Sequence, residues 1–105
     1  MTQKLSALAD VIRSKNSGPF ELTFDIIFKT DEIYRCVAAS GFINKESFAA
    51  LYNINPENII KIVNFDPAKA IKITIIRPIP SGGLRETDVY GAQQHAPLMG
   101  MEISL

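Results

Sequence analysis

The chain has 105 residues, of which 47% are hydrophobic and 21% are charged. These values are typical of a globular domain and exclude a disordered or fibrous chain, and the length predicts one domain that folds without disulfides or metals. Lys and Arg together number 11, as do Asp and Glu, so no overall field gathers nucleic acid or an anionic membrane. We expect neither as a partner.

The first residues and the cysteine content indicate the cytoplasm. Residues 1–13 contain Lys4, Asp10 and Arg13 and no uninterrupted apolar run, which predicts neither a signal peptide nor a membrane span. The single cysteine, Cys36, cannot form an internal disulfide and suits a reducing compartment. We expect Cys36 to be buried on the apolar side of a helix.

Two strands are predicted at the start of the chain. Apolar residues within 5–12 also fit helical spacing, but Val11, Arg13 and Lys15 share one side of an extended chain, and a strand is favoured. Residues 20–28 alternate apolar side chains with others. This period of two is typical of a strand with one face on the core.

Two helices are predicted next. Thr30 and the acidic residues after it form a start signal, and Gly41 is placed to end the helix, so we predict a helix over about 31–40. Asn44 repeats the start signal, and apolar residues at helical spacing follow before the run breaks at 53–56. This pattern predicts a second, shorter helix.

The second half of the chain predicts a hairpin. β-branched residues favour a strand over 58–65, residues 66–68 form a turn, and residues 70–76 alternate again. The run 101–104 adds a short edge strand. Strands and helices that segregate in this way predict an α+β fold, a two-layer sandwich of a mostly antiparallel sheet with two helices on one face. Five phenylalanines are assigned to its core: Phe20, Phe24, Phe28, Phe48 and Phe65.

The carboxyl-terminal stretch has no regular apolar pattern. We divide the single domain into a body, residues 1–77, and an irregular tail, residues 78–105. A loop of this length in a compact chain is usually functional or disordered. Because its polar residues stand among apolar ones such as Val89 and Leu98, we expect the tail to dock on the body and to carry function.

The first candidate site is the polar stretch that begins at Arg13. Arg13 and Lys15 project to the same side of a strand, and the glycine-containing turn after them can aim backbone N–H groups at an anion. We predict Arg13, Ser14, Lys15 and Asn16 as ligand-binding residues for a carboxylate or phosphate. The alternative is a solvated polar turn, since the stretch lacks the spacing of known phosphate-binding loops.

The second candidate site lies in the tail. Asp88, Tyr90, Gln93, Gln94 and His95 supply a carboxylate, a phenol, two amides and the only imidazole of the chain. His95 is the candidate acid or base and Asp88 its candidate catalytic partner, whereas the phenol and the amides bind. The alternative for a lone histidine is a capping or packing role.

Other kinds of site are poorly supported. Ser14 or Ser17 with His95 and Asp88 has the ingredients of a nucleophilic triad, but no strained elbow motif accompanies them. One histidine and one cysteine do not make a zinc site, and an ion bound by oxygen ligands through Asp88 stays open. We predict no metal site, and no cofactor can be named.

Three segments resemble an uncharacterised bacterial family filed as domain of unknown function 4387. They are residues 8–23 (LADVIRSKNSGPFELT), 65–68 (FDPA) and 87–97 (TDVYGAQQHAP), and the likeness covers nearly the whole chain. Members of that family occur as small separate proteins or at the carboxyl end of larger proteins resembling the acyclic terpene utilisation protein A. A related domain of those proteins has a ferredoxin-like fold and a turn similar to Arg13-Ser14.

This resemblance implies a ferredoxin-like architecture and a larger partner in small-molecule catabolism, of acyl-coenzyme A or isoprenoid acids. It supplies no catalytic residues. We predict an accessory or interaction domain that completes a small-molecule site, of carboxylate or acyl-coenzyme A type, with that partner or as a homo-oligomer. The alternative is a stand-alone enzyme in which Arg13 and Lys15 hold an anionic metabolite and His95 is the acid or base.

Overall fold

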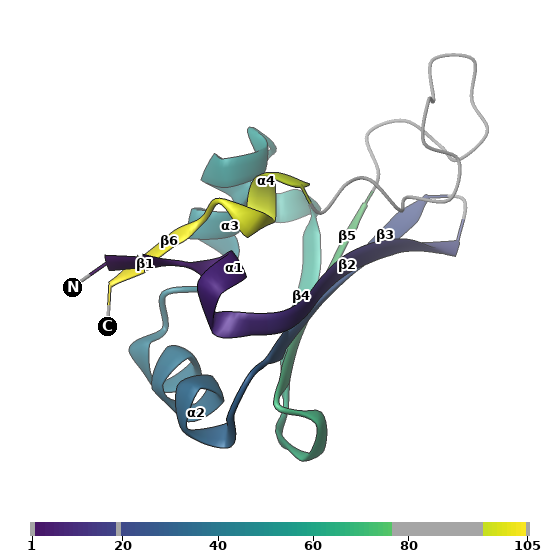
Figure 1. The fold of residues 1–105 in the computed structure, drawn as a ribbon. Coiled ribbons are helices and arrows are strands. Elements are labelled where there is room, and N and C mark those ends of the chain that lie inside the picture. Colours follow the sequence, from purple (N-terminus) through teal and green to yellow (C-terminus); the bar gives the residue numbers. More distant parts are fainter. Residues whose placement is uncertain (1, 19, 77–95, 105) are drawn as a thin grey trace.

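The computed structural model describes residues 2–18, 20–76 and 96–104 (Figure 1). These residues form six strands and four helices, with two short 3-10 turns, η1 and η2, on either side of one strand. The elements are β1 (Thr2–Lys4), α1 (Leu5–Leu8), β2 (Ala9–Gly18), β3 (Glu21–Phe28), α2 (Asp31–Ser40), α3 (Lys45–Tyr52), η1 (Pro56–Asn58), β4 (Ile59–Phe65), η2 (Asp66–Ala68), β5 (Ala70–Ile76), α4 (Ala96–Met99) and β6 (Glu102–Ser104).

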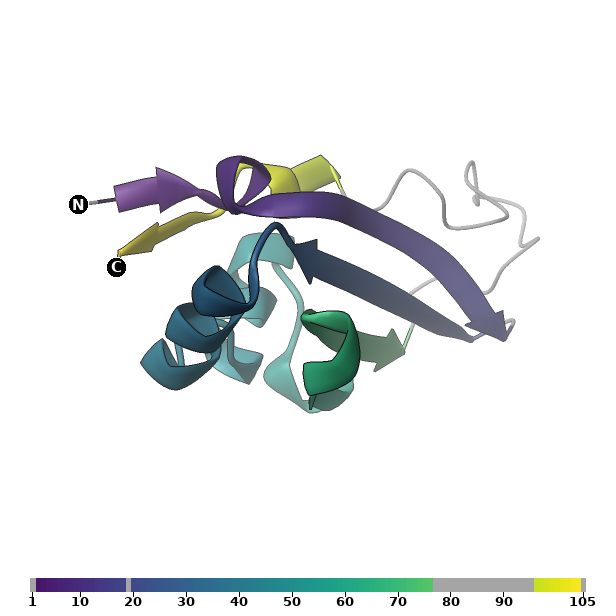
Figure 2. The same ribbon diagram turned by 60° about the horizontal axis from the view of Figure 1, so that its bottom comes forward.

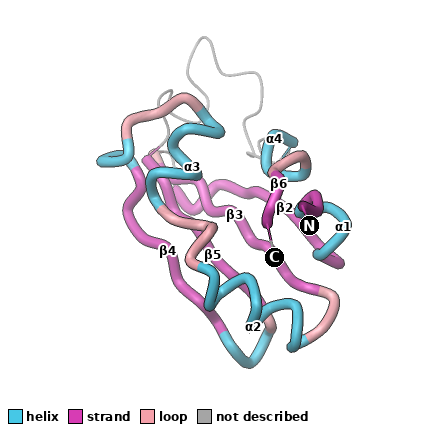
Figure 3. The backbone as a smooth tube through the Cα atoms, turned by 90° about the vertical axis from the view of Figure 1, so that its left-hand side faces the viewer, coloured by secondary structure: helices cyan, strands magenta, loops and turns pink. Residues whose placement is uncertain are grey.

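The main sheet has four strands in the order β2-β3-β5-β4, and each pair of neighbouring strands is antiparallel. Helices α2 and α3 connect β3 to β4, and β5 lies between these two strands. This is the split β-α-β arrangement that ferredoxin-like sandwiches contain. The predicted α+β two-layer sandwich is confirmed, and Figure 3 shows both helices lying along the sheet.

Strand β3 has the alternation that its sequence predicts. Leu22, Phe24, Ile26 and Phe28 are at most 3% exposed and belong to the core, and they share a face with the isoleucines of β5 at positions 71, 73 and 75. Successive side chains of a strand point to opposite faces. The residues between them therefore lie on the other side of the sheet.

Helices α2 and α3 begin and end at the predicted signals. The Thr30 hydroxyl accepts a hydrogen bond from the Ile33 amide, and Gly41 ends α2 with φ 65°, a conformation that glycine adopts at little cost. Asn44 forms a capping box with Ser47 at the start of α3. The predicted helix over 31–40 and the shorter one after it are confirmed.

An aromatic cluster fixes α3 on the sheet. The Phe24 ring lies 5.0 Å from the Phe48 ring and 5.1 Å from the Tyr52 ring, and Phe48 and Tyr52 stack at 4.5 Å. Such pairs are worth about 0.5–1.5 kcal/mol each beyond their burial. Burial among these rings also raises the pKa of the Tyr52 phenol above its ordinary value.

The opening segment contains both of the elements that its sequence allows. Apolar residues at helical spacing form the single-turn helix α1, and the alternating residues after it form β2, the longest strand. The predicted strand is therefore correct from Ala9 onward, and the helical alternative is correct for Leu5–Leu8.

The two ends of the described chain pair with each other. β6 lies antiparallel to β1 in a separate two-stranded sheet, with Thr2 opposite Ser104 (Figure 2). The Leu5 amide donates to the Met101 carbonyl at 2.8 Å, and Leu98 and Ile103 are 0% exposed in the core. Residues 96–104 of the predicted tail thus close the core.

Three predictions of burial were wrong. Cys36 is exposed, because the buried residues of α2 are Tyr34 and Val37, and Cys36 lies two positions from Tyr34 on another side of the helix. Phe65 is 46% exposed because it stands on the face of the sheet opposite the core, and Phe20, before the start of β3, is 58% exposed. Phe24, Phe28 and Phe48 are buried as predicted.

Candidate ligand-binding face

Side chains of all four strands of the main sheet form cross-strand rows on the face opposite the core. We call this the outer face, and it comprises the strand residues that alternate with the core-facing ones. Its first row is apolar and consists of Val11, Ile27, Ala70 and Phe65, which are register partners across the four strands. The ends of this row, Val11 and Phe65, are exposed.

The second row carries an ion pair between an exposed arginine and a buried aspartate. Arg13 is opposite Asp25, Asp25 is opposite Lys72, and Lys72 is opposite Val63. The Arg13 Nε donates to the Asp25 Oδ2 at 3.0 Å, and the side chains are 56% and 3% exposed. The Asp25 Oδ1 is buried without a hydrogen-bond partner among the described residues. Buried carboxylate oxygens normally accept hydrogen bonds, so the Asp25 Oδ1 is an unsatisfied acceptor within the described part of the outer face.

The third row places hydroxyl groups between two lysines. Lys15 is opposite Thr23, Thr23 is opposite Thr74, and Thr74 is opposite Lys61. The Thr23 hydroxyl donates to the Ser17 hydroxyl at 2.9 Å. Hydroxyl and ammonium donors of this kind suit an anionic ligand.

The outer face has an excess of positive charge. Its cations are the four side chains of the second and third rows, and its acids are Asp25 and Glu21, which stands opposite Ile76 at one end of β3. Asp25 compensates Arg13. Among the described residues, Lys15 and Lys61 form no ion pair, and the Lys72 ammonium lies 5.7 Å from the Phe65 ring.

The structure divides the first predicted set between the two faces of β2. Arg13 and Lys15 lie on the outer face, as the predicted strand geometry requires. Ser14 is opposite Phe24 and Asn16 is opposite Leu22, on the core side. The polar stretch is extended strand as far as Gly18 rather than a turn. Only its two cations can therefore approach one ligand on the outer face.

The second predicted set, Asp88, Tyr90, Gln93, Gln94 and His95, lies outside the described residues. Its catalytic and binding roles stay predictions. The same holds for a triad or an ion site that uses His95 or Asp88. Among the described residues, no group of three or more His, Cys, Asp or Glu side chains could hold a metal ion.

Sequence reasoning missed the contributions of β3, β5 and β4. Asp25, Lys72 and Lys61 stand beside Arg13 and Lys15 only because of the strand order and register. One signal was present in the sequence: Asp25 interrupts an otherwise apolar stretch from Phe24 to Phe28. A carboxylate in such a position requires a partner.

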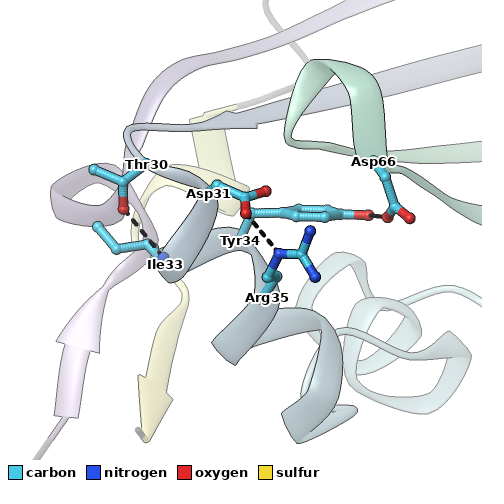
Figure 4. Close-up of polar contacts among 6 residues, drawn as sticks. All are labelled: Thr30, Asp31, Ile33, Tyr34, Arg35 and Asp66. Atoms are coloured by element: carbon cyan, nitrogen blue, oxygen red, sulfur yellow. Dashed lines mark hydrogen bonds and ion pairs between the residues drawn. The ribbon is translucent and has the colours of Figure 1, made fainter.

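A second polar contact joins α2 to the turn between β4 and β5 (Figure 4). The Tyr34 hydroxyl donates to the Asp66 Oδ1, and the neighbouring Arg35 pairs with Asp31 at the surface. Tyr34 is 2% exposed. Burial, supported by the hydrogen bond to Asp66, raises the pKa of Tyr34 from 10.0 to about 12. The contact is structural, since it lies on the helical layer.

A surface pocket of about 320 Å³ lies where β2 begins. The register shifts between Ala9 and Val11, so Asp10 is an extra residue in the strand, and such bulges redirect side chains. The pocket is mostly apolar. It is lined by Ser6, Ala9, Asp10, Val11, Ile12 and Met99.

No helix in the described ranges has the length and apolar character that crossing a membrane requires.

Comparison with known proteins identifies the family and no individual relative. No curated protein and no solved structure matches the chain. A family model described as Domain of unknown function (DUF4387) matches residues 5–102. This match includes all four strands of the main sheet and therefore the whole outer face. The chain belongs to the DUF4387 family.

Proposed function

We propose that the chain is an accessory domain whose outer face binds the carboxylate end of a small amphipathic molecule. The observation that carries the proposal is the arrangement of rows on this face. An apolar row that includes Val11 and Phe65 runs beside rows that hold Arg13, Lys15 and Lys72. A ligand with an aliphatic tail and an anionic head matches both parts at once.

The chemistry of this face supports an accessory role. Its described side chains are cations, hydroxyls, apolar groups and carboxylates, which can bind and orient a ligand but do not make a complete catalytic set. A larger protein or a second copy of the chain would supply the remaining groups. The family resemblance favours a larger partner of small-molecule catabolism, acting on carboxylates or acyl-coenzyme A esters.

The test is a thermal-shift titration of the purified protein with sodium octanoate. Sodium acetate lacks the tail and octylamine lacks the negative charge, so neither satisfies both parts of the face. At about ten times its dissociation constant, octanoate stabilises the native state by about 1.4 kcal/mol and raises the melting temperature by roughly 6 to 11 °C. Acetate and octylamine are expected to give much smaller shifts.

Two charge-reversal variants locate the binding. Lys15→Glu reverses a cation of the outer face that forms no described ion pair, and Lys45→Glu makes the same charge change at the exposed start of α3. We expect the octanoate shift to vanish in Lys15→Glu and to persist in Lys45→Glu. Equal shifts in both variants, or no shift in the wild type, would contradict the proposal.

The alternative function, a stand-alone enzyme with His95 as acid or base, rests on residues outside the described ranges. No described contact favours it over the accessory role.

A further inference from the structure

The two edge strands of the main sheet differ in how they are protected against pairing with another chain. β4 is one edge, and three of its large apolar side chains are exposed: Ile60 by 43%, Val63 by 41% and Phe65 by 46%. Its sequence, IIKIVNF, contains one charge and neither proline nor glycine. An exposed edge of this composition is a template for a further strand.

The other edge, β2, has the features that keep edges from pairing. Its register shifts at both ends, between Ala9 and Val11 and between Asn16 and Gly18. It also carries Asp10, Arg13 and Lys15, all exposed. Bulges and charged side chains are the usual means of preventing edge-to-edge contact. The contrast between the strands therefore favours β4 as the interaction edge.

We propose that a second copy of the chain pairs antiparallel along β4, with Val63 on the two-fold axis. The bulge between Ile59 and Lys61 interrupts the strand at one end, and the turn η2 follows Phe65 at the other. The regular part of β4 is thus residues 61–65, whose centre is Val63. Two-fold pairing about this centre uses the whole regular ladder and joins the two sheets into one.

The charges of β4 fit a second copy as the occupant. In this register Lys61 lies opposite Phe65 of the second copy, and no charge lies opposite a like charge. Lys72 and Phe65 already form a contact of this kind within the chain, at 5.7 Å. The formal net charge of the chain is +0 at pH 7, so no general repulsion opposes self-association.

The dimer extends the proposed function and rests on it, because the proposed accessory role requires a partner beside the ligand. Because opposite residues in paired strands share a face, both outer faces lie on the same side of the joined sheet. Val63 and Phe65 belong to the outer face. The second rows of the two copies therefore meet at the axis, and the apolar row of each copy continues into the third row of the other. A short ladder gives a small interface, and we expect a weak dimer.

Sedimentation velocity without any ligand tests the pairing. Val63→Lys places two like charges opposite each other at the axis, and Val11→Lys is the matched control, with 41% and 37% exposure of the native side chains on the same face. We expect the wild type and Val11→Lys to reach twice the 11.6 kDa chain mass at high concentration. Val63→Lys should raise the dissociation constant about tenfold or more.

The register is tested by cysteine cross-linking in a Cys36→Ser background, since the natural thiol is exposed. Val63→Cys should form a disulfide-linked dimer under mild oxidation, whereas Val11→Cys should not. A wild type that stays monomeric up to its solubility limit overturns the dimer, as does equal behaviour of the two lysine variants. Failure of cross-linking at position 63 in a proven dimer overturns the stated register.

Octanoate titration of the wild type, at protein concentrations below and above the dimer dissociation constant, separates the two proposals. Because the cations of the outer face belong to one chain, the wild type should still bind octanoate at concentrations where it is monomeric. Loss of octanoate binding in a protein that dimerises contradicts the proposed ligand and leaves the dimer standing. A wild type that binds octanoate but stays monomeric up to its solubility limit overturns the dimer and leaves the ligand standing.

Discussion

At the scale of single residues, the Tyr34–Asp66 contact makes stability depend on alkaline pH. The folded-state pKa of Tyr34, about 12, lies above its ordinary value of 10.0, so folding favours the protonated phenol. The resulting contribution to the free energy of unfolding is complete below pH 10 and is lost as the pH rises toward 12. By pH 11 about 1.4 kcal/mol should have disappeared. Urea unfolding at pH 8 and pH 11, compared with Tyr34→Phe, measures the loss.

The phenylalanine variant lacks this titration and isolates it from other groups. Tyr52, whose pKa is also raised by burial, titrates in both proteins, so its effect cancels in the difference. At pH 8 the wild type should be more stable by about 1 kcal/mol, the usual worth of one hydrogen bond. A difference between the two proteins that is the same at pH 8 and pH 11 would count against the assignment.

At the scale of elements, the start of α3 depends on Asn44. Its side-chain oxygen accepts from the Ser47 amide at 2.8 Å, and its Nδ2 donates to the Gly41 carbonyl at 2.9 Å. Asn44→Ala removes both bonds and should cost about 1 to 2 kcal/mol. Asn44→Asp keeps the capping oxygen and should lose less. Urea midpoints at an unchanged slope measure both losses, and equal losses would refute the capping role.

At the scale of the whole molecule, the chain ends belong to the same core as the main sheet. Ile103 in β6 is 0% exposed and contacts the common cluster, whereas Met99 in α4 is 42% exposed. Ile103→Ala should cost about 3 kcal/mol, and Met99→Ala should cost under about 1 kcal/mol. We expect one cooperative thermal transition, seen alike by far-ultraviolet circular dichroism and tyrosine fluorescence.

If β1 and β6 formed a unit that folded separately from the main sheet, the thermal unfolding of the Ile103→Ala variant would differ. Ile103→Ala would then leave the main transition in place and create a second one at lower temperature. The hydrogen bond between Leu5 and Met101 and the burial of Leu98 argue for a single unit.

Local signals in the sequence determined the two longer helices, α2 and α3, and the four strands of the main sheet. Thr30 and Gly41 limit α2 because a cap acts on amides or carbonyls within a few residues, and the alternation in β3 records which side chains meet the core. The opening segment follows the same rule. Its residues at helical spacing form α1, and the alternating residues after them form β2.

Tertiary structure alone decided which residues meet on the outer face. Asp25, Lys72 and Val63 come from three strands, and only the order β2-β3-β5-β4 and its register place them in one row with Arg13. The same packing left Cys36 and Phe65 exposed, against the sequence prediction. Strand pairing brings together residues far apart in the chain, and the free energy of that pairing is a property of the whole sheet, which no short stretch of sequence records.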